Sequence, residues 1–128
     1  MNDRASRPPL VLVADDDARS ARVLARLLRA DGYEVEVTLD GAATIGRLCR
    51  APSPDVLVTD IRMPHASGLD AAHFGRSMNP KLSVVLVSAY YDDVPLGDRS
   101  FKRFDKPLDY NALAAELGRG RPNHGIVA

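Results

Sequence analysis

Several features that mark other classes of protein are missing or rare in this sequence. It has a single cysteine, Cys49, so no intramolecular disulfide can form. Lysine plus arginine and aspartate plus glutamate number 17 each, and the lack of a basic excess argues against direct binding to nucleic acid. There is no recognisable signal peptide and no apolar run long enough to cross a membrane. These absences predict a cytoplasmic protein that binds neither nucleic acid nor membrane.

What is present fits one small domain. The chain has 128 residues, of which 45% are hydrophobic and 27% charged, enough for one core. Residues 1–9 are polar and end in two prolines, which is typical of a flexible N-terminal lead. We predict a folded domain over residues 10–117 and a C-terminal tail over residues 118–128.

Apolar segments alternate with amphipathic segments along this domain. The expected strands cover residues 10–14, 33–38, 56–60, 82–87 and 101–105, and the expected helices cover residues 18–30, 42–50, 69–77 and 110–117. Such alternation predicts an α/β fold with a parallel sheet. Residues 89–98 contain a proline and a glycine and lack an apolar stripe, so at most a short or irregular fourth helix is expected there.

The helix over residues 18–30 is expected to bury one face and expose the other. Its apolar stripe comprises Val23, Leu24, Leu27 and Leu28. Its opposite side carries Arg19, Arg22, Arg26 and Arg29. These arginines form either a solvated face or a docking surface for an acidic partner. In the next helix, Ile45, Leu48 and Cys49 are expected to face the core.

Acidic residues stand where two buried strands end. Asp60 follows Val56, Leu57 and Val58, and either caps the next helix or takes part in chemistry. The run 15–17 consists of three aspartates, which repel one another. The cluster is explained either by the dipole of the helix that follows or by a bound cation.

Polar side chains at four strand ends form a chemically coherent set. They are Asp15, Asp16, Asp60, Ser88 and Lys106. The carboxyl ends of parallel strands share one edge of the sheet, so these groups are expected to converge. Carboxylates suit Mg²⁺, and an aspartate can act as a phosphoryl acceptor. Lys106 would neutralise phosphoryl charge and Ser88 would donate a hydrogen bond to a phosphoryl oxygen, which suits phosphoryl transfer.

The order of these motifs resembles the receiver domain of two-component response regulators. The residues that carry the resemblance are Leu12-Val13-Ala14-Asp15-Asp16, Asp60 with Met63-Pro64 and Gly68, Ser88-Ala89, and Lys106-Pro107. Each motif is weak by itself, but their order and spacing together are specific. The resemblance covers residues 10 to about 117.

The resemblance implies a fold and a set of roles. The fold would be flavodoxin-like (CheY-like), a doubly wound five-stranded parallel sheet of order 2-1-3-4-5. Asp60 would accept a phosphoryl group from a sensor histidine kinase or a histidine phosphotransfer protein. Asp15, Asp16, Asp60 and the backbone carbonyl of Arg62 would hold Mg²⁺, Ser88 would be the switch hydroxyl and Lys106 would pair with the phosphate. The protein would be a phosphoacceptor switch that slowly dephosphorylates itself, not an enzyme.

The sequence departs from the family pattern at several positions. Ser88 stands where threonine is commoner, and Arg103 stands where an aromatic residue usually couples to the switch hydroxyl. Strand alternation would point the neighbouring Phe104 to the other face. The segment 88–106 is about one helical turn shorter than the family norm, which implies a changed output surface and an unusual partner.

Two large side chains near the acceptor raise a question about phosphoryl lifetime. Arg62 lies two residues after Asp60, and Tyr90 lies two residues after Ser88. Either they hinder attacking water and lengthen the lifetime, or both point into solvent. The family often dimerises on phosphorylation, so a homodimer is possible, and a stand-alone receiver with an unknown downstream target is expected.

Two other functions compete with this hypothesis. The first is a pseudo-receiver, an interaction module that is not regulated by phosphorylation. The second is a phosphatase of the haloacid dehalogenase type, which also uses a strand-end aspartate and Mg²⁺. That class usually has an Asp-x-Asp motif and a cap domain, whereas Arg62 stands two residues after Asp60 and no segment here is long enough for a cap.

Overall fold

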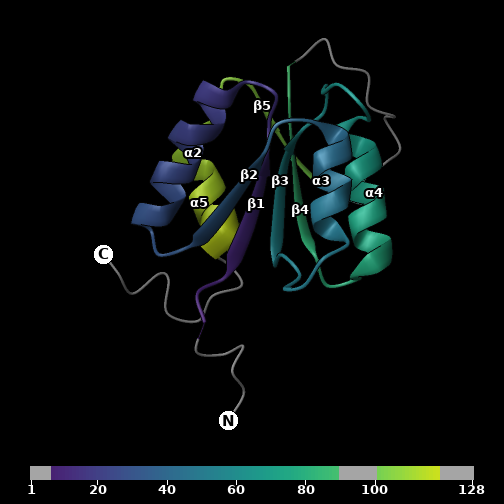
Figure 1. The fold of residues 1–128 in the computed structure, drawn as a ribbon. Coiled ribbons are helices and arrows are strands. Elements are labelled where there is room, and N and C mark those ends of the chain that lie inside the picture. Colours follow the sequence, from purple (N-terminus) through teal and green to yellow (C-terminus); the bar gives the residue numbers. More distant parts are fainter. Residues whose placement is uncertain (1–6, 90–100, 119–128) are drawn as a thin grey trace.

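The computed structural model describes residues 7–89 and 101–118, and these form a sheet with helices on both faces (Figure 1). The strands are β1 (Leu10–Ala14), β2 (Glu34–Thr38), β3 (Val56–Asp60), β4 (Ser83–Ser88) and β5 (Lys102–Asp105). All neighbouring strands are parallel, in the order β2-β1-β3-β4-β5. The predicted flavodoxin-like fold and strand order are confirmed.

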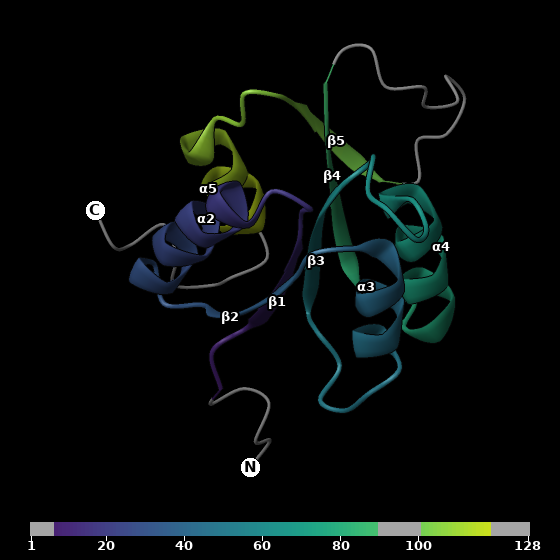
Figure 2. The same ribbon diagram turned by 45° about the horizontal axis from the view of Figure 1, so that its top comes forward.

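The helices divide between the two faces of the sheet. They are α2 (Ala18–Ala30), α3 (Gly41–Leu48), α4 (Gly68–Met78) and α5 (Tyr110–Gly118). Helices α2 and α5 lie side by side on one face, and α3 and α4 lie on the other (Figures 1 and 2). The phenolic oxygen of Tyr110 on α5 donates to the Asp31 carboxylate at the end of α2, 2.6 Å away, and joins the first pair.

Strand alternation divides the core in the same way. Every residue of β1 and β3 is buried, and all of β4 except Ser83 is buried. Val11 and Val13 of β1 pack with Leu28 and Leu113 on the side of α2 and α5. Leu12 and Ala14 pack with the apolar residues on the side of α3 and α4. A strand buried on both faces cannot shift by one residue without exchanging its two sets of side chains, so the register at the functional edge is firmly fixed.

Helix α2 has the predicted bounds, and its buried face agrees with the prediction in part, since Leu28 lies in the core and Leu24 packs against it. The residues that are fully buried are Ala21, Ala25 and Leu28, whereas Val23 and Leu27 are 49% and 40% exposed. The predicted stripe was therefore wrong for Val23 and Leu27. Ala21 and Ala25 lie in the core cluster together with Leu28, so small side chains supply part of the face that packs on the sheet. The four arginines of this helix are exposed, which agrees with a solvated face.

Cys49 was also predicted wrongly. Helix α3 ends at Leu48, and Cys49 is its exposed C-terminal cap. The inward positions near this end belong to Leu48 and to Arg47, a residue that a hydrophobic pattern does not assign to a core. The irregular fourth helix predicted within residues 90–100 lies outside the described residues and stays a prediction.

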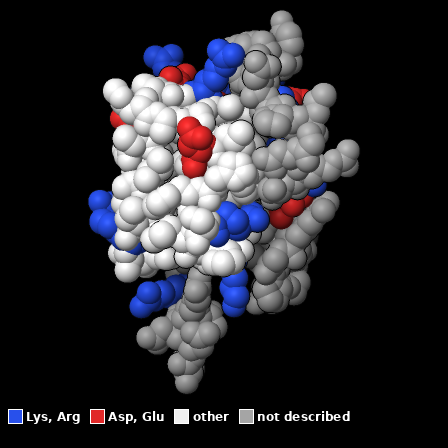
Figure 3. All heavy atoms as spheres, turned by 90° about the vertical axis from the view of Figure 1, so that its right-hand side faces the viewer, with Lys and Arg blue, Asp and Glu red and all other residues white. Residues whose placement is uncertain are grey.

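The charges visible on the α4 side of the molecule do not form a large patch of one sign (Figure 3). Acidic and basic side chains are scattered among uncharged ones, and most lie toward the rim of this view. Within residues 7–89 and 101–118, no helix combines the length and apolar character needed to span a membrane.

Candidate functional site

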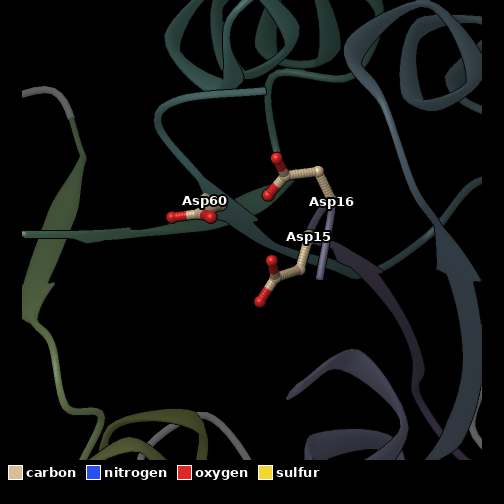
Figure 4. Close-up of side chains that lie close together, drawn as sticks. All are labelled: Asp15, Asp16 and Asp60. Carbon is tan, nitrogen blue, oxygen red and sulfur yellow. The ribbon is translucent and has the colours of Figure 1, made fainter. Parts of the chain in front are cut away.

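Three carboxylates meet at the carboxyl edge of the sheet. Asp15 and Asp16 follow β1 directly, and Asp60 is the last residue of the neighbouring strand β3. One carboxylate oxygen from each lies within 4.8 Å of the others, and Figure 4 shows the three groups gathered around a common space. The sequence predicted this convergence, and the geometry agrees with it. Three hard oxygen donors at this spacing fit a divalent cation such as Mg²⁺.

The third member of the aspartate run has a different role. The Asp17 side chain accepts the backbone N–H groups of Arg19 and Ser20 and is the N-cap of α2. The backbone N–H of Asp17 in turn donates to Asp15 Oδ1 at 2.9 Å, which helps to fix the Asp15 carboxylate. The two explanations of the aspartate run therefore apply to different residues. Asp17 stabilises a helix terminus, while Asp15 and Asp16 form the acidic group with Asp60.

Lys106 binds the central carboxylate directly. Its Nζ lies 2.8 Å from Asp60 Oδ1 and 2.9 Å from Asp60 Oδ2. The Asp60 side chain is only 6% exposed, whereas the Lys106 side chain is 41% exposed. The backbone N–H of Lys106 donates to the carbonyl of Ser88 at the end of β4. The loop after β5 is thereby tied to the same edge as the carboxylates.

Burial and mutual repulsion change the titration of these groups. Burial, reinforced by the charge of Asp15, raises the pKa of Asp60 to about 6 despite the hydrogen bond from Lys106. Burial likewise raises the pKa of Asp15. Partial burial of Lys106 would lower its pKa, but its hydrogen bond to Asp60 and the nearby carboxylates outweigh this and raise it. One lysine does not neutralise three carboxylates, so the site is electrostatically suited to another cation.

The backbone of Gly68 lies directly against the backbone of Asp60 and Ile61. The N–H of Gly68 donates to the carbonyl of Ile61 at 2.7 Å, and a Cβ at Gly68 would overlap the carbonyl oxygen of Asp60. The buried Thr59 hydroxyl donates to that same Asp60 carbonyl at 2.9 Å. Only glycine fits at position 68, which gives a physical reason for its place in the motif.

Ser88 and Arg103 meet beside this group. Ser88 ends β4 and is fully buried, and the Arg103 Nε of β5 donates to Ser88 Oγ at 2.7 Å. Phe104 packs in the core on the side of α2 and α5, as strand alternation predicted. Sequence reasoning noted that Arg103 replaces an aromatic residue but missed its bond to the hydroxyl. Leu86 of β4 pairs with Arg103 of β5, and this register places the Arg103 side chain near Ser88.

For two further predicted site residues, Arg62 and Tyr90, the structure does not test the predicted role. Arg62 is exposed in the loop after β3, and its backbone carbonyl as a metal ligand stays a prediction. Tyr90 lies outside the described residues, so its effect on phosphoryl lifetime stays a prediction too. The core of the site therefore consists of the three carboxylates, Lys106 and the pair formed by Ser88 and Arg103.

Fold and site together define a doubly wound α/β protein with an acidic, lysine-paired site at the carboxyl edge of its sheet. The sequence profile of the response regulator receiver domain matches residues 11–103. The chain belongs to this family and is a receiver domain of the kind found in two-component signalling.

Similar proteins agree with this assignment. The chain is 40% identical over 83 residues to the probable transcriptional regulatory protein TcrX of Mycobacterium tuberculosis (strain ATCC 25618 / H37Rv), a match covering 65% of this chain and 35% of that protein. It is 33% identical over 113 residues to the DNA-binding transcriptional regulator NtrC of Rhizobium meliloti (strain 1021), covering 85% of this chain and 23% of that protein. The chain thus spans only about a third or less of the length of these relatives.

Solved structures show the same fold. The receiver domain of the hybrid histidine kinase CckA superposes with a TM-score of 0.72 at 30% identity, covering 86% of this chain and 96% of that one. The response regulator TrrA of Thermotoga maritima, solved in complex with Mg²⁺ and BeF, gives a TM-score of 0.77 at 23% identity, covering 87% and 97%. The second likeness concerns the fold alone.

Proposed function

We propose that Asp60 accepts a phosphoryl group in a Mg²⁺-dependent reaction, and that this chain is a phosphoacceptor switch. The observation that carries the proposal is the buried Asp60 carboxylate, held by Lys106 and grouped with two further carboxylates. Membership of the receiver family supports it. The donor would be a sensor histidine kinase or a histidine phosphotransfer protein.

The proposed reaction is a displacement at phosphorus. One Asp60 carboxylate oxygen attacks the phosphorus of a phosphohistidine whose other ring nitrogen is protonated. A P–O bond forms, the P–N bond breaks with its electron pair going to the ring nitrogen, and the histidine leaves as neutral imidazole. Lys106 stays protonated and moves its hydrogen bond from the carboxylate to a phosphoryl oxygen. Asp15, Asp16, Asp60 and the backbone carbonyl of Arg62 would hold Mg²⁺. The bound cation would neutralise phosphoryl charge, so that positioning and electrostatics supply most of the catalysis.

After transfer, Ser88 would report the new group. The hydroxyl of a serine has one proton to donate, and a phosphoryl oxygen on the neighbouring strand is a strong acceptor. Hydrolysis of the acyl phosphate by water would return the switch slowly to its starting state. Arg62 and Tyr90 would set the rate of that step by restricting the approach of water.

The partners of this chain, the bounds of its functional unit and its location in the cell are also proposals. The two relatives named above are transcriptional regulators, so an output linked to transcription is compatible with this chain, although we propose no direct contact with nucleic acid. We propose residues 10–117 as the functional unit, acting in the cytoplasm on an as yet unidentified protein. Phosphorylation could also drive formation of a homodimer.

The test is the intact mass after incubation with acetyl phosphate, with and without Mg²⁺. We expect one added phosphoryl group in the wild type only when Mg²⁺ is present, and none in Asp60→Asn. Asp17→Asn is the matched control, since it also removes one carboxylate near the site while asparagine still caps α2. We expect it to be phosphorylated as the wild type is.

A pseudo-receiver would behave differently in the same experiment. Arg103 at an altered switch position is the observation that favours this alternative. Absence of an adduct in the wild type, together with no binding of beryllium fluoride and Mg²⁺, would establish it and reject the phosphoacceptor function. The phosphatase alternative receives no support from the family match.

The proposed tuning of lifetime has a test of its own. In the phosphorylated wild type, the donor is washed away while the Mg²⁺ concentration is held constant, and loss of the added mass is followed over time. The Arg62→Ala, Tyr90→Ala variant should lose phosphate several-fold faster than the wild type. Equal rates would show that these side chains do not restrict water.

A further inference from the structure

Arg103 makes a contact with Ser88 that the proposed phosphoryl transfer does not itself require. Arg103 Nε lies 2.7 Å from Ser88 Oγ, and the Ser88 side chain is fully buried. Arg103 also lies 3.8 Å from Asp105 Oδ1, a looser pair in which the Asp105 side chain is 76% exposed. The short contact to a buried hydroxyl is therefore the more restrictive of the two.

Hydrogen-bond chemistry gives this contact a direction. A guanidinium can only donate, so Ser88 Oγ must be the acceptor. A serine hydroxyl that accepts from a cation still has its own proton, and that proton must point away from the arginine. Donation by a charged group also polarises the hydroxyl and makes it a better donor.

The acceptor for this proton lies toward the neighbouring strand. Asp60 pairs with Val87 in the register of β3 and β4, and Ser88 is the next residue of β4. A phosphoryl group on Asp60 would thus be attached beside the end of β4. Arg103, on the other neighbour of β4, approaches Ser88 from the β5 side. Ser88 stands between a donor on one strand and the proposed phosphoacceptor on another.

We propose that Arg103 is a positioning residue, which orients and polarises the Ser88 hydroxyl so that it donates to the phosphoryl oxygen. This inference rests on the proposed function of Asp60. In place of the aromatic residue usual in the family, a cation takes part in a relay that runs from Arg103 through Ser88 to the phosphoryl group. The relay couples the end of β5 to the state of Asp60 through hydrogen bonds instead of the packing of a ring.

The first test compares phosphorylation by acetyl phosphate and binding of beryllium fluoride with Mg²⁺, measured by calorimetry. Arg103→Met keeps the length of the side chain and removes its donors. Loss of one hydrogen bond from a charged donor predicts roughly a tenfold fall in both the phosphorylation rate and the affinity. Arg103→Lys retains a charged donor and should restore part of the loss.

Two controls separate this role from simple loss of charge. Lys102→Met removes one positive charge from the adjacent position of β5, where the side chain pairs with Glu116 at 3.7 Å. Asp105→Asn removes the looser partner of Arg103. Both variants should behave like the wild type, and thermal unfolding of every variant establishes that it is folded at the temperature of the assay.

A double-mutant cycle tests whether Arg103 acts through Ser88. In a Ser88→Ala background, Arg103→Met should cause no further loss, because the hydroxyl that it orients is gone. Nuclear magnetic resonance of the Arg103 Nε–H provides a readout independent of activity. Its slowly exchanging signal should be present in the wild type, lost in Ser88→Ala and unchanged in Lys102→Met.

The outcomes distinguish this inference from the proposed function. A wild type that is phosphorylated normally, with Arg103→Met equal to Lys102→Met, would overturn the inference and leave the function of Asp60 intact. An additive double mutant would also overturn it, since Arg103 would then act independently of Ser88. A wild type that neither takes up phosphate nor binds beryllium fluoride would overturn both proposals.

Discussion

Two ion pairs in this molecule are built with opposite arrangements of burial. In the pair of Arg47 and Glu36, the cation is buried at 5% exposure and the carboxylate is 47% exposed. In the pair of Lys106 and Asp60, the carboxylate is buried at 6% and the cation is 41% exposed. Both pairs have short contacts, at 2.6 Å and 2.8 Å. Distance alone therefore does not distinguish them.

The two ion pairs differ in the groups that surround the buried charge, Arg47 in one pair and Asp60 in the other. Arg47 donates to Glu36 and to the backbone carbonyls of Arg50 and Pro52, so its charge and its donors are matched. Among the residues that the structure describes, the Asp60 carboxylate is paired with Lys106 and lies near two further carboxylates, those of Asp15 and Asp16. The hydrogen bond from Arg47 lowers the pKa of Glu36, whereas burial raises that of Asp60 to about 6. A matched buried charge fixes structure, and an unmatched one provides a site for a ligand of opposite charge.

The largest expected effect is the fall in the free energy of unfolding when the buried cation Arg47 is replaced. Arg47→Met leaves two carbonyls and a carboxylate without their donor and should lower the free energy of unfolding by about 3 kcal/mol. Lys106→Met should change it by less than about 1 kcal/mol, because Asp60 can take up a proton instead, yet it should abolish phosphorylation. Urea unfolding at neutral pH, alongside the mass assay, measures both. Equal destabilisation by the two variants would remove the distinction between a structural and a functional pair.

The second prediction concerns the backbone that holds Asp60. Gly68→Ala forces a Cβ against the Asp60 carbonyl and should destabilise the fold by about 2 kcal/mol while slowing phosphorylation. Gly46→Ala is the control within helix α3, where a Cβ would meet nothing within 4 Å. It should stabilise the protein by about 0.5–1 kcal/mol, since alanine favours a helix interior. A Gly68→Ala variant as stable as the wild type would show that the close approach is readily relieved.

The third prediction uses pH, in protein treated with a chelator. Burial raises the pKa of Asp60 to about 6 from its ordinary value of 3.8, so ionising Asp60 costs stability as pH rises through this window. Asp60→Asn should therefore be more stable than the wild type by on the order of 2 kcal/mol at pH 7, and equal to it below about pH 4. Thermal or urea unfolding across this range provides the measurement. A difference that does not vary with pH would contradict an unmatched buried carboxylate.

The smallest expected effect concerns Glu36, and the pH dependence of its contribution to stability should have the opposite sign to that of Asp60. The pKa of Glu36 is lowered by Arg47, so its stabilisation is present above its ordinary pKa and is lost as pH falls. Glu36→Gln should cost only about 0.5–1 kcal/mol at pH 7, because the carboxylate is half exposed, and less in acid. Unfolding of Glu36→Gln and Asp60→Asn in the same buffers compares the two slopes directly. Slopes of the same sign would mean that the two pairs do not differ electrostatically.

Much of the fold was predictable because its signals are local. Continuous apolar runs identified β1, β3 and β4, and alternation with helices indicated a parallel sheet. The acidic group was predictable too, because parallel strands bring their carboxyl ends to one edge. The core-facing side of α2 was predicted only in part: Leu24 and Leu28 were correct, but Ala21 and Ala25 give a weaker hydrophobic signal than the exposed Val23 and Leu27. The position of Cys49 depended on where α3 ends, which periodicity fixes only within a residue or two.

The sequence by itself determined the family, the strand order implied by it, and the convergence of Asp15, Asp16 and Asp60. These depend on residue type and on position along each strand. Only the tertiary structure decided that Arg47 is a buried structural cation and that Arg103 donates to Ser88. Both contacts join different elements of the fold, so their existence depends on register and burial, which no local pattern contains.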